Sequence, residues 1–218
     1  QMCIRDSYKT GHFGKWHLNR VGTEEALAHH PLPADDPHNP GEFGFDYWLS
    51  HTTGWDLDPE LSRNGDREQF EGEGSVVIVD EALKFIARGV SNNTPVFVVI
   101  WYSAPHGPWA ASDEDIAPFL GKVDRTSAHA HGEIVGIDRS IGNLRQGLQD
   151  LGIANDTLIW FTSDNGGSPN LDVRVWASKD PFGGAGGQGV EIEYPSDCSD
   201  QIDPDLTSFE ARELHGCI

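Results

Sequence analysis

Two apolar runs, each preceded by a helical pattern, most strongly limit the folds open to this chain. The runs are residues 95–102 (PVFVVIWY) and 157–162 (TLIWFT), and neither has a helical period. Residues 75–89 and 127–151 instead place apolar side chains three and four positions apart, as one face of a helix does. A continuous apolar strand is typical of a parallel sheet that is covered on both faces. The order helix, strand, helix, strand therefore predicts an α/β fold with a mostly parallel sheet flanked by helices.

Glycines are expected to end both helices, because glycine readily adopts the left-handed backbone of a helix C-terminus. Gly89 follows the first pattern and Gly152 follows the second. The second pattern is the clearer helix, and we expect its apolar stripe to face the core. The members of that stripe are Ile134, Ile137, Ile141, Leu144, Leu148 and Leu151.

Composition excludes several classes of function. A length of 218 residues suffices for one sizeable domain, or for part of a larger one. The net charge of -20 argues against nucleic acid and against anionic membrane surfaces as partners. No apolar run reaches the roughly 18 residues that a membrane span needs. The three cysteines lie near the ends of the chain, which is not the pattern of a disulfide framework.

A carboxylate and an amide follow the second apolar run directly. In open α/β sheets, ligands bind beyond the carboxyl ends of the strands, and Asp164 and Asn165 are predicted to lie at such an end. Two hard oxygen donors suit Ca²⁺ or Mg²⁺ better than zinc. The alternative is an Asx-type turn that binds no metal.

Two further segments carry candidate site residues. His106 follows the first apolar run and is flanked by prolines, a position that favours a site histidine. In an extended segment, Lys15 and His17 would project from the same side and form a small anion site. The alternative is an edge strand with a solvated lysine and a core histidine. Residues 19–46 and 51–74 are predicted to be surface loops, with an aromatic turn at 41–48.

Four segments together resemble the type I sulfatases of the alkaline phosphatase superfamily. They are residues 8–18 (YKTGHFGKWHL), 44–46 (GFD), 104–108 (APHGP) and 157–166 (TLIWFTSDNG), and they occur in the order and with spacing similar to the family's. The resemblance covers about residues 8–168. It implies an alkaline phosphatase/sulfatase-like fold, here incomplete, and hydrolysis of the sulfate ester of a small molecule or glycan. It also implies a periplasmic, secreted or lysosomal-type compartment.

The resemblance also implies roles for individual residues. Asp164 and Asn165 would be two ligands of a single Ca²⁺. Lys15 and His17 would contact the nucleophile and the sulfate. His106 would bind the sulfate and protonate the leaving alcohol. Lys179 is matched to a further sulfate-binding lysine, although the glutamate that follows this lysine in the family is absent here.

Two family features are missing from the sequence. The family's nucleophile is a formylglycine made from the cysteine of a Cys-x-Pro/Ala-x-Arg motif, and Cys3-Ile4-Arg5 is not that motif. The family's N-terminal Asp-Asp metal pair is also absent. We therefore expect an internal fragment of a sulfatase that is inactive by itself. Residues 1–7 would be a non-family leader, 8–168 a partial catalytic domain, and 169–218 a degraded or irregular segment, disturbed by a reading-frame error.

Two other functions fit the same motifs. The first is hydrolysis of phosphate or phosphonate esters, because the superfamily shares the metal-binding strand. The second is a non-catalytic module that binds calcium or a sulfated glycan. The sequence identifies neither the alcohol part of the substrate nor the oligomeric state.

Overall fold

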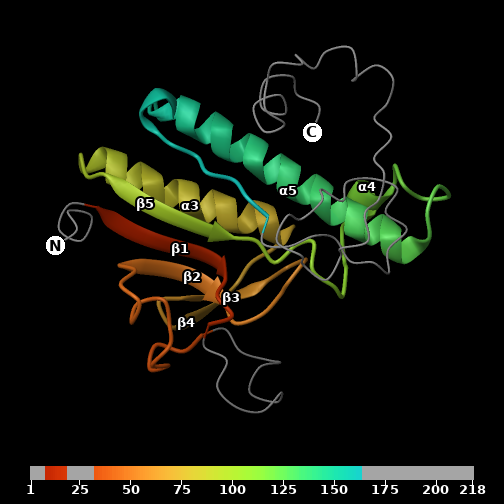
Figure 1. Ribbon diagram of the computed structural model, residues 1–218, viewed down its shortest axis with the longest axis horizontal. Helices are drawn as coiled ribbons and strands as arrows, with labels where there is room; N and C mark the ends of the chain where they lie inside the picture. The colour runs from red at the N-terminus through yellow and green to blue at the C-terminus, as the bar shows by residue number, and fades with distance from the viewer. Residues whose placement is uncertain (1–7, 19–31, 164–218) are drawn as a thin grey trace, which may run out of the picture. The chain divides into compact units, whose positions relative to one another are not determined.

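The computed structural model describes residues 8–18 and 32–163 of the chain. Contacts divide the chain into two units, Gln1–Trp160 and Phe161–Ile218. Every helix and strand of the described residues lies in the first unit (Figure 1).

The centre of this unit is a mixed five-stranded sheet with the order β4-β3-β2-β1-β5. Strand β1 pairs in parallel with both β2 and β5, whereas β2–β3 and β3–β4 are antiparallel pairs. The predicted α/β class is confirmed, with the parallel pairs in the segments that carry the site motifs. The strands are β1 (Lys9–Lys15), β2 (Tyr47–His51), β3 (Glu60–Arg63), β4 (Asp66–Gln69) and β5 (Val96–Trp101).

Two long helices accompany the sheet. Helix α3 packs on β1 and β5, and α5 packs on α3 (Figure 1). The main core joins β-strand and α3 side chains, and the predicted helix at 75–89 is confirmed. The helices are α3 (Gly74–Ser91), α4 (Asp113–Ile116), α5 (Arg125–Asp150) and the 3-10 helix η1 (Ala154–Asp156). The buried members of the core cluster are Phe13, Leu49, Leu61, Ile78, Ala82 and Phe85.

Of the two glycines that were expected to end helices, only one lies at a helix end. Gly89 lies inside α3, because the helix continues to Ser91. A Cβ at Gly89 would lie 2.4 Å from Cγ1 of Val96, so glycine here allows α3 to approach β5 closely. Gly152 follows the C-cap of α5 with a φ of 72°, and its expected role is confirmed.

The apolar stripe of α5 is only partly core. Leu148 is buried, but Ile134 is 46% exposed. Small residues bring α5 close to α3: a Cβ at Gly147 would lie 2.5 Å from Leu83. This close packing buries a face that differs from the isoleucine stripe, and the prediction that the whole stripe is core is wrong. The buried residues of α5 are Ser127, Ala128, Ala130, Gly132, Glu133, Gly136, Ser140 and Leu148.

The prediction of a loop over 51–74 is wrong for its middle part. Strands β3 and β4 form a hairpin there. Asn64 and Gly65 turn it with φ angles of 52° and 104°, as expected for a two-residue turn in which both residues have positive φ. Asn64 also accepts a hydrogen bond from the backbone N–H of Trp48 at 2.8 Å.

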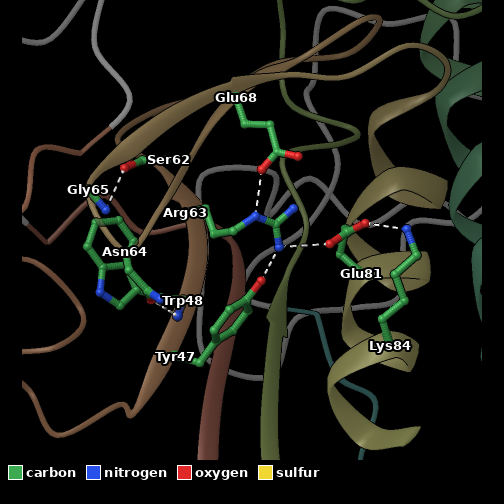
Figure 2. Close-up of polar contacts among 9 residues, drawn as sticks. All are labelled: Tyr47, Trp48, Ser62, Arg63, Asn64, Gly65, Glu68, Glu81 and Lys84. Atoms are coloured by element: carbon green, nitrogen blue, oxygen red, sulfur yellow. Dashed lines mark hydrogen bonds and ion pairs between the residues drawn. The ribbon is translucent and has the colours of Figure 1, made fainter. Parts of the chain in front are cut away.

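An arginine attaches this hairpin to α3 (Figure 2). Arg63 of β3 donates to Glu68 at 2.5 Å, to Glu81 of α3 at 2.9 Å, and to the hydroxyl of Tyr47. Lys84 also donates to Glu81, at 2.5 Å. Burial alone would raise the pKa of Glu81, but the hydrogen bonds from Lys84 and Arg63 outweigh it and the pKa lies below its ordinary value.

The predicted buried strand at 157–162 is not formed. Residues 157–163 make no β-pairing, and Leu158 and Trp160 are 88% and 84% exposed. An apolar strand is buried only when a neighbouring strand and covering layers enclose it. Among the described residues, β5 pairs with β1 alone, and the 157–162 segment pairs with no strand.

Candidate functional site

The carboxyl ends of three parallel strands meet at one edge of the sheet. Lys15 ends β1 and is paired in register with His51, the last residue of β2. Trp101 ends β5 and is paired with Gly14. The segments that leave these strands therefore start side by side, as the general rule for ligand sites in α/β sheets requires.

Gly14 allows β1 to end at this edge. Its φ is +106°, and a Cβ there would lie 2.0 Å from the carbonyl oxygen of Trp101. No other residue could occupy this position without moving β5. Beyond it the backbone stays attached to the segment after β2, since Trp16 donates to the oxygen of His51 at 2.8 Å and His17 to that of Thr52 at 2.9 Å.

His17 is exposed and has a left-handed backbone, with a φ of 56°. Lys15 is half-buried at the end of the strand. Lys15 and His17 were predicted to project from the same side of an extended segment. The extended backbone ends before His17, so that prediction does not hold for His17. Both residues nevertheless belong to the same edge of the sheet.

His106 lies on the loop that follows β5. Its backbone N–H donates to the oxygen of Ser103 at 3.2 Å, and its Nδ1 lies 2.7 Å from the carbonyl oxygen of Gly107. A carbonyl oxygen can only accept, so Nδ1 carries the proton in this contact. Nε2 of the exposed ring is then the atom that can exchange a proton with a bound group.

Contacts across the edge hold its segments together. The hydroxyl of Ser103 accepts from the backbone N–H of Trp55 at 3.1 Å, joining the segments after β5 and β2. The N–H of Gly74 donates to the oxygen of Asp56 at 2.8 Å, which places the N-terminus of α3 at the same edge. Glu73 caps that helix by accepting from two of its N–H groups, both at 3.0 Å.

His12 shows that one histidine of the first motif is a core residue. It is fully buried, and its Nδ1 lies 2.7 Å from the hydroxyl of Ser50. Burial lowers the pKa of His12 to about 3, so the ring is neutral. It makes edge contacts with Trp16, Phe45 and Trp101. The motif therefore supplies one structural histidine and one exposed histidine.

Three acidic residues near this edge, Asp56, Glu73 and Glu133, belong to none of the sequence motifs. Burial, and then the charge of Asp56, raises the pKa of Glu133 to about 8. Burial, and then the charge of Glu73, raises the pKa of Asp56 to about 6. No motif marks them, because they come from a loop, a helix cap and the middle of α5. His51 was missed because strand β2 was not predicted: an aromatic turn was expected at 41–48 and a loop at 51–74.

The predicted site residues are divided between described and undescribed parts of the chain. Lys15, His17 and His106 lie at the common edge. Asp164, Asn165 and Lys179 lie outside the described residues. Within residues 8–18 and 32–163, no group of three or more His, Cys, Asp or Glu side chains is arranged to hold a metal ion. As donors, one carboxylate and one amide fit Ca²⁺, which prefers oxygen ligands.

The fold and this edge define an α/β protein with basic side chains beyond the ends of its parallel strands. The Sulfatase family model matches residues 4–191, and the chain belongs to that family. The family membership confirms the resemblance on which the predicted site residues depend.

Individual relatives agree with this assignment. The chain is 32% identical over 194 residues to human N-acetylgalactosamine-6-sulfatase, covering 84% of this chain and 35% of the relative. It is 28% identical over 179 residues to the uncharacterized sulfatase YdeN of Escherichia coli (strain K12), covering 73% of this chain and 31% of the relative. The chain thus spans about a third of the length of these curated relatives.

A solved structure of another protein has a similar fold. The structure of Ps i-CgsB in complex with k-i-k-neocarrahexaose matches with a TM-score of 0.55 and 23% identity, covering 67% of this chain and 35% of that one. In residues 8–18 and 32–163, no helix has the length and apolar character needed to cross a membrane.

Proposed function

We propose that this chain carries part of the active site of a hydrolase that cleaves sulfate esters of a saccharide or another small molecule. The observation that supports this most is the placement of Lys15, His17 and His106 beyond the ends of adjacent parallel strands. Membership in the sulfatase family supports the reaction class. The name of the human relative and the ligand of the solved structure support a saccharide substrate.

The chemistry explains why basic side chains are needed. As the S–O bond breaks, negative charge increases on the sulfate oxygens and on the departing alcohol oxygen. Lys15 supplies a fixed positive charge for the sulfate oxygens, and such preorganised electrostatic stabilisation is usually the largest catalytic effect. His106 in its imidazolium form donates the Nε2 proton to the leaving alcohol. Its Nδ1–H, bonded to the oxygen of Gly107, fixes the orientation of the ring.

Asp164 and Asn165 would hold a Ca²⁺ ion together with further oxygen ligands, such as the N-terminal Asp-Asp pair of the family. When bound, the ion acts as a Lewis acid on a sulfate oxygen. Tight calcium sites use six to eight oxygens, so we expect the isolated chain to bind Ca²⁺ weakly.

In the proposed reaction, the nucleophile comes from the family's cysteine motif. The sequence contains no Cys-x-Pro/Ala-x-Arg motif. The isolated 218-residue chain should therefore turn over no sulfate ester. Turnover by the purified chain that is lost in His106→Ala would contradict this expectation, whereas activity unaffected by that change would point to a contaminating enzyme.

Activity ratios separate the proposed function from its alternatives. The test uses a longer protein that contains this chain together with the Asp-Asp pair and the cysteine motif. Sulfate and phosphate esters of the same phenol are compared. The proposal predicts faster hydrolysis of the sulfate ester. Preference for the phosphate ester would assign the chain to a phosphate or phosphonate hydrolase, and glycan binding without any turnover would indicate a non-catalytic module.

A further inference from the structure

The loop that carries His106 is attached to α5 at its far end. The backbone N–H of Ala110 donates to Oε1 of Glu133 at 2.8 Å. The N–H of Ala111 donates to Nδ1 of His129 at 3.1 Å. Within the loop, Nε1 of Trp109 donates to the oxygen of Pro105 at 2.9 Å. Two α5 side chains thus hold the backbone that begins four residues after His106.

Glu133 is unusual for an acidic residue. It is 2% exposed, and its Oε2 is buried without a hydrogen-bond partner among the described residues. None of the ion pairs between described residues includes it. An ionised carboxylate in such a place would be costly, because burying an unpaired charge removes its hydration.

Among the described residues, the charged groups that shift the pKa of the buried Glu133 are acidic. Asp56, from the loop after β2, and Glu73, at the N-terminus of α3, both raise its pKa. Glu73 lies against the next turn of α5: a Cβ at Gly136 would be 2.6 Å from its carboxyl carbon. The oxygens of Glu73 already accept from the first N–H groups of α3, so they are fixed in this position.

The remaining titratable groups nearby are neutral or already paired. Nδ1 of His129 is occupied by the hydrogen bond that it accepts from Ala111. Burial raises the pKa of Tyr102, whose hydroxyl lies 2.9 Å from that of Ser140. Farther along α5, the guanidinium of Arg139 pairs with Asp115 of α4.

We propose that Glu133 is a positioning residue for His106: as a neutral acid it holds loop 103–111 on α5, and loss of its proton releases that loop. In the neutral form, Oε1 accepts from Ala110 and the acid proton resides on the buried Oε2. Ionisation places another negative charge near Asp56 and Glu73, and within residues 8–18 and 32–163 no cation pairs with Glu133. Repulsion then favours a separation of the loop from the helix. The importance of this release for catalysis rests on the proposed function, but the attachment itself does not.

Hydrogen exchange measured by mass spectrometry on the 218-residue chain tests this inference. Exchange rates of the peptide that covers 103–112 are measured from pH 6 to pH 9.5 and corrected for intrinsic exchange. In the wild type we expect protection to fall as the pH rises to about 8, the pKa of Glu133 in the attached loop, and to level off above that value. Between pH 6 and about pH 8, an opening linked to the loss of one proton should become about tenfold more favourable for each pH unit.

Glu133→Gln is the decisive variant. The amide oxygen still accepts from Ala110, and the NH₂ group stands where the acid proton is, but the side chain cannot ionise. Its loop should stay protected across the whole pH range. Glu114→Gln, an exposed acid on α4, should behave as the wild type does. The proposal is wrong if Glu133→Gln loses protection with rising pH as the wild type does, or if the wild type loses none between pH 6 and about pH 8.

A third variant separates loss of the contact from loss of the fold. Glu133→Ala should leave the loop unprotected at every pH, while β1 and α3 remain protected. If these elements also lose protection, the comparison of Glu133→Gln with the wild type still decides the question. Because no substrate is used, failure of the proposed sulfatase function would not change the result.

Discussion

At the residue scale, the site edge depends on side chains that sequence patterns cannot assign. His12 and His17 belong to one motif, yet one is a neutral core residue and the other is exposed. The difference depends on which strand packs over each ring, and that is a property of the folded sheet. Glu133 was missed for the same reason: its burial follows from the close packing of α5, and no motif surrounds it.

A stability prediction at this scale concerns Gly14. Gly14→Ala should lower the free energy of unfolding by about 2–4 kcal/mol, because the new Cβ combines a positive φ with a backbone clash at Trp101. Gly72→Ala is the matched control: its φ is +105°, but a Cβ there meets nothing within 4 Å. Urea denaturation measures both changes. Equal losses in the two variants would show that the clash with β5 contributes nothing.

The pH dependence of stability is a second prediction at this scale. The pKa of Glu133 is raised from 4.5 to about 8, so the folded protein binds more protons than the unfolded chain between these values. Stability from this group is therefore complete below pH 4.5 and is lost as the pH rises to about 8, a change of roughly 3–5 kcal/mol.

The Glu133→Gln variant isolates this contribution. Its stability should vary less with pH over the same window, with the titration of Asp56 still present below about pH 6. Urea midpoints measured at half-unit pH intervals provide the comparison. Parallel curves for wild type and variant would contradict the raised pKa of Glu133.

At the element scale, local sequence patterns predicted the two long helices and the continuous apolar strand. Helical periodicity located α3 and α5, and the continuous apolar run located β5. The hairpin β3–β4 carried a signal in Asn64-Gly65 that the acidic loop composition obscured. The predicted strand at 157–162 failed because burial of a strand depends on a neighbour, which a local pattern cannot supply.

The Arg63 network gives a prediction for the attachment of the hairpin to α3. Arg63→Ala leaves the buried carboxylate of Glu81 with Lys84 alone and should destabilise the fold by about 2–4 kcal/mol. Arg67→Ala is the control, since its pair with Glu60 spans 3.8 Å between half-exposed side chains. Such surface pairs contribute about 0–1 kcal/mol. Similar losses in both variants, measured by urea unfolding, would exclude a special role for the network.

At the scale of the whole molecule, the family and the site edge follow from the order of the motifs along the chain. The parallel pairing of β1 with β2 and β5 brings together residues that are up to 91 positions apart, from Lys15 to His106. The predicted metal ligands lie outside the described residues, so calcium binding stays a prediction. The side chains of Leu158 and Trp160 are exposed. The chain spans about a third of the length of its curated relatives.

The measurement that tests the central claim most directly is turnover of a sulfated monosaccharide by a longer protein that contains this chain with the missing motifs. His106→Ala should lower kcat by about 10²–10⁴-fold, as expected for loss of a general acid. Lys15→Ala should also reduce turnover strongly, and His131→Ala, on α5 beside Phe119, should leave it unchanged. Full activity in His106→Ala and Lys15→Ala would show that this edge of the sheet is not where sulfate esters are cleaved.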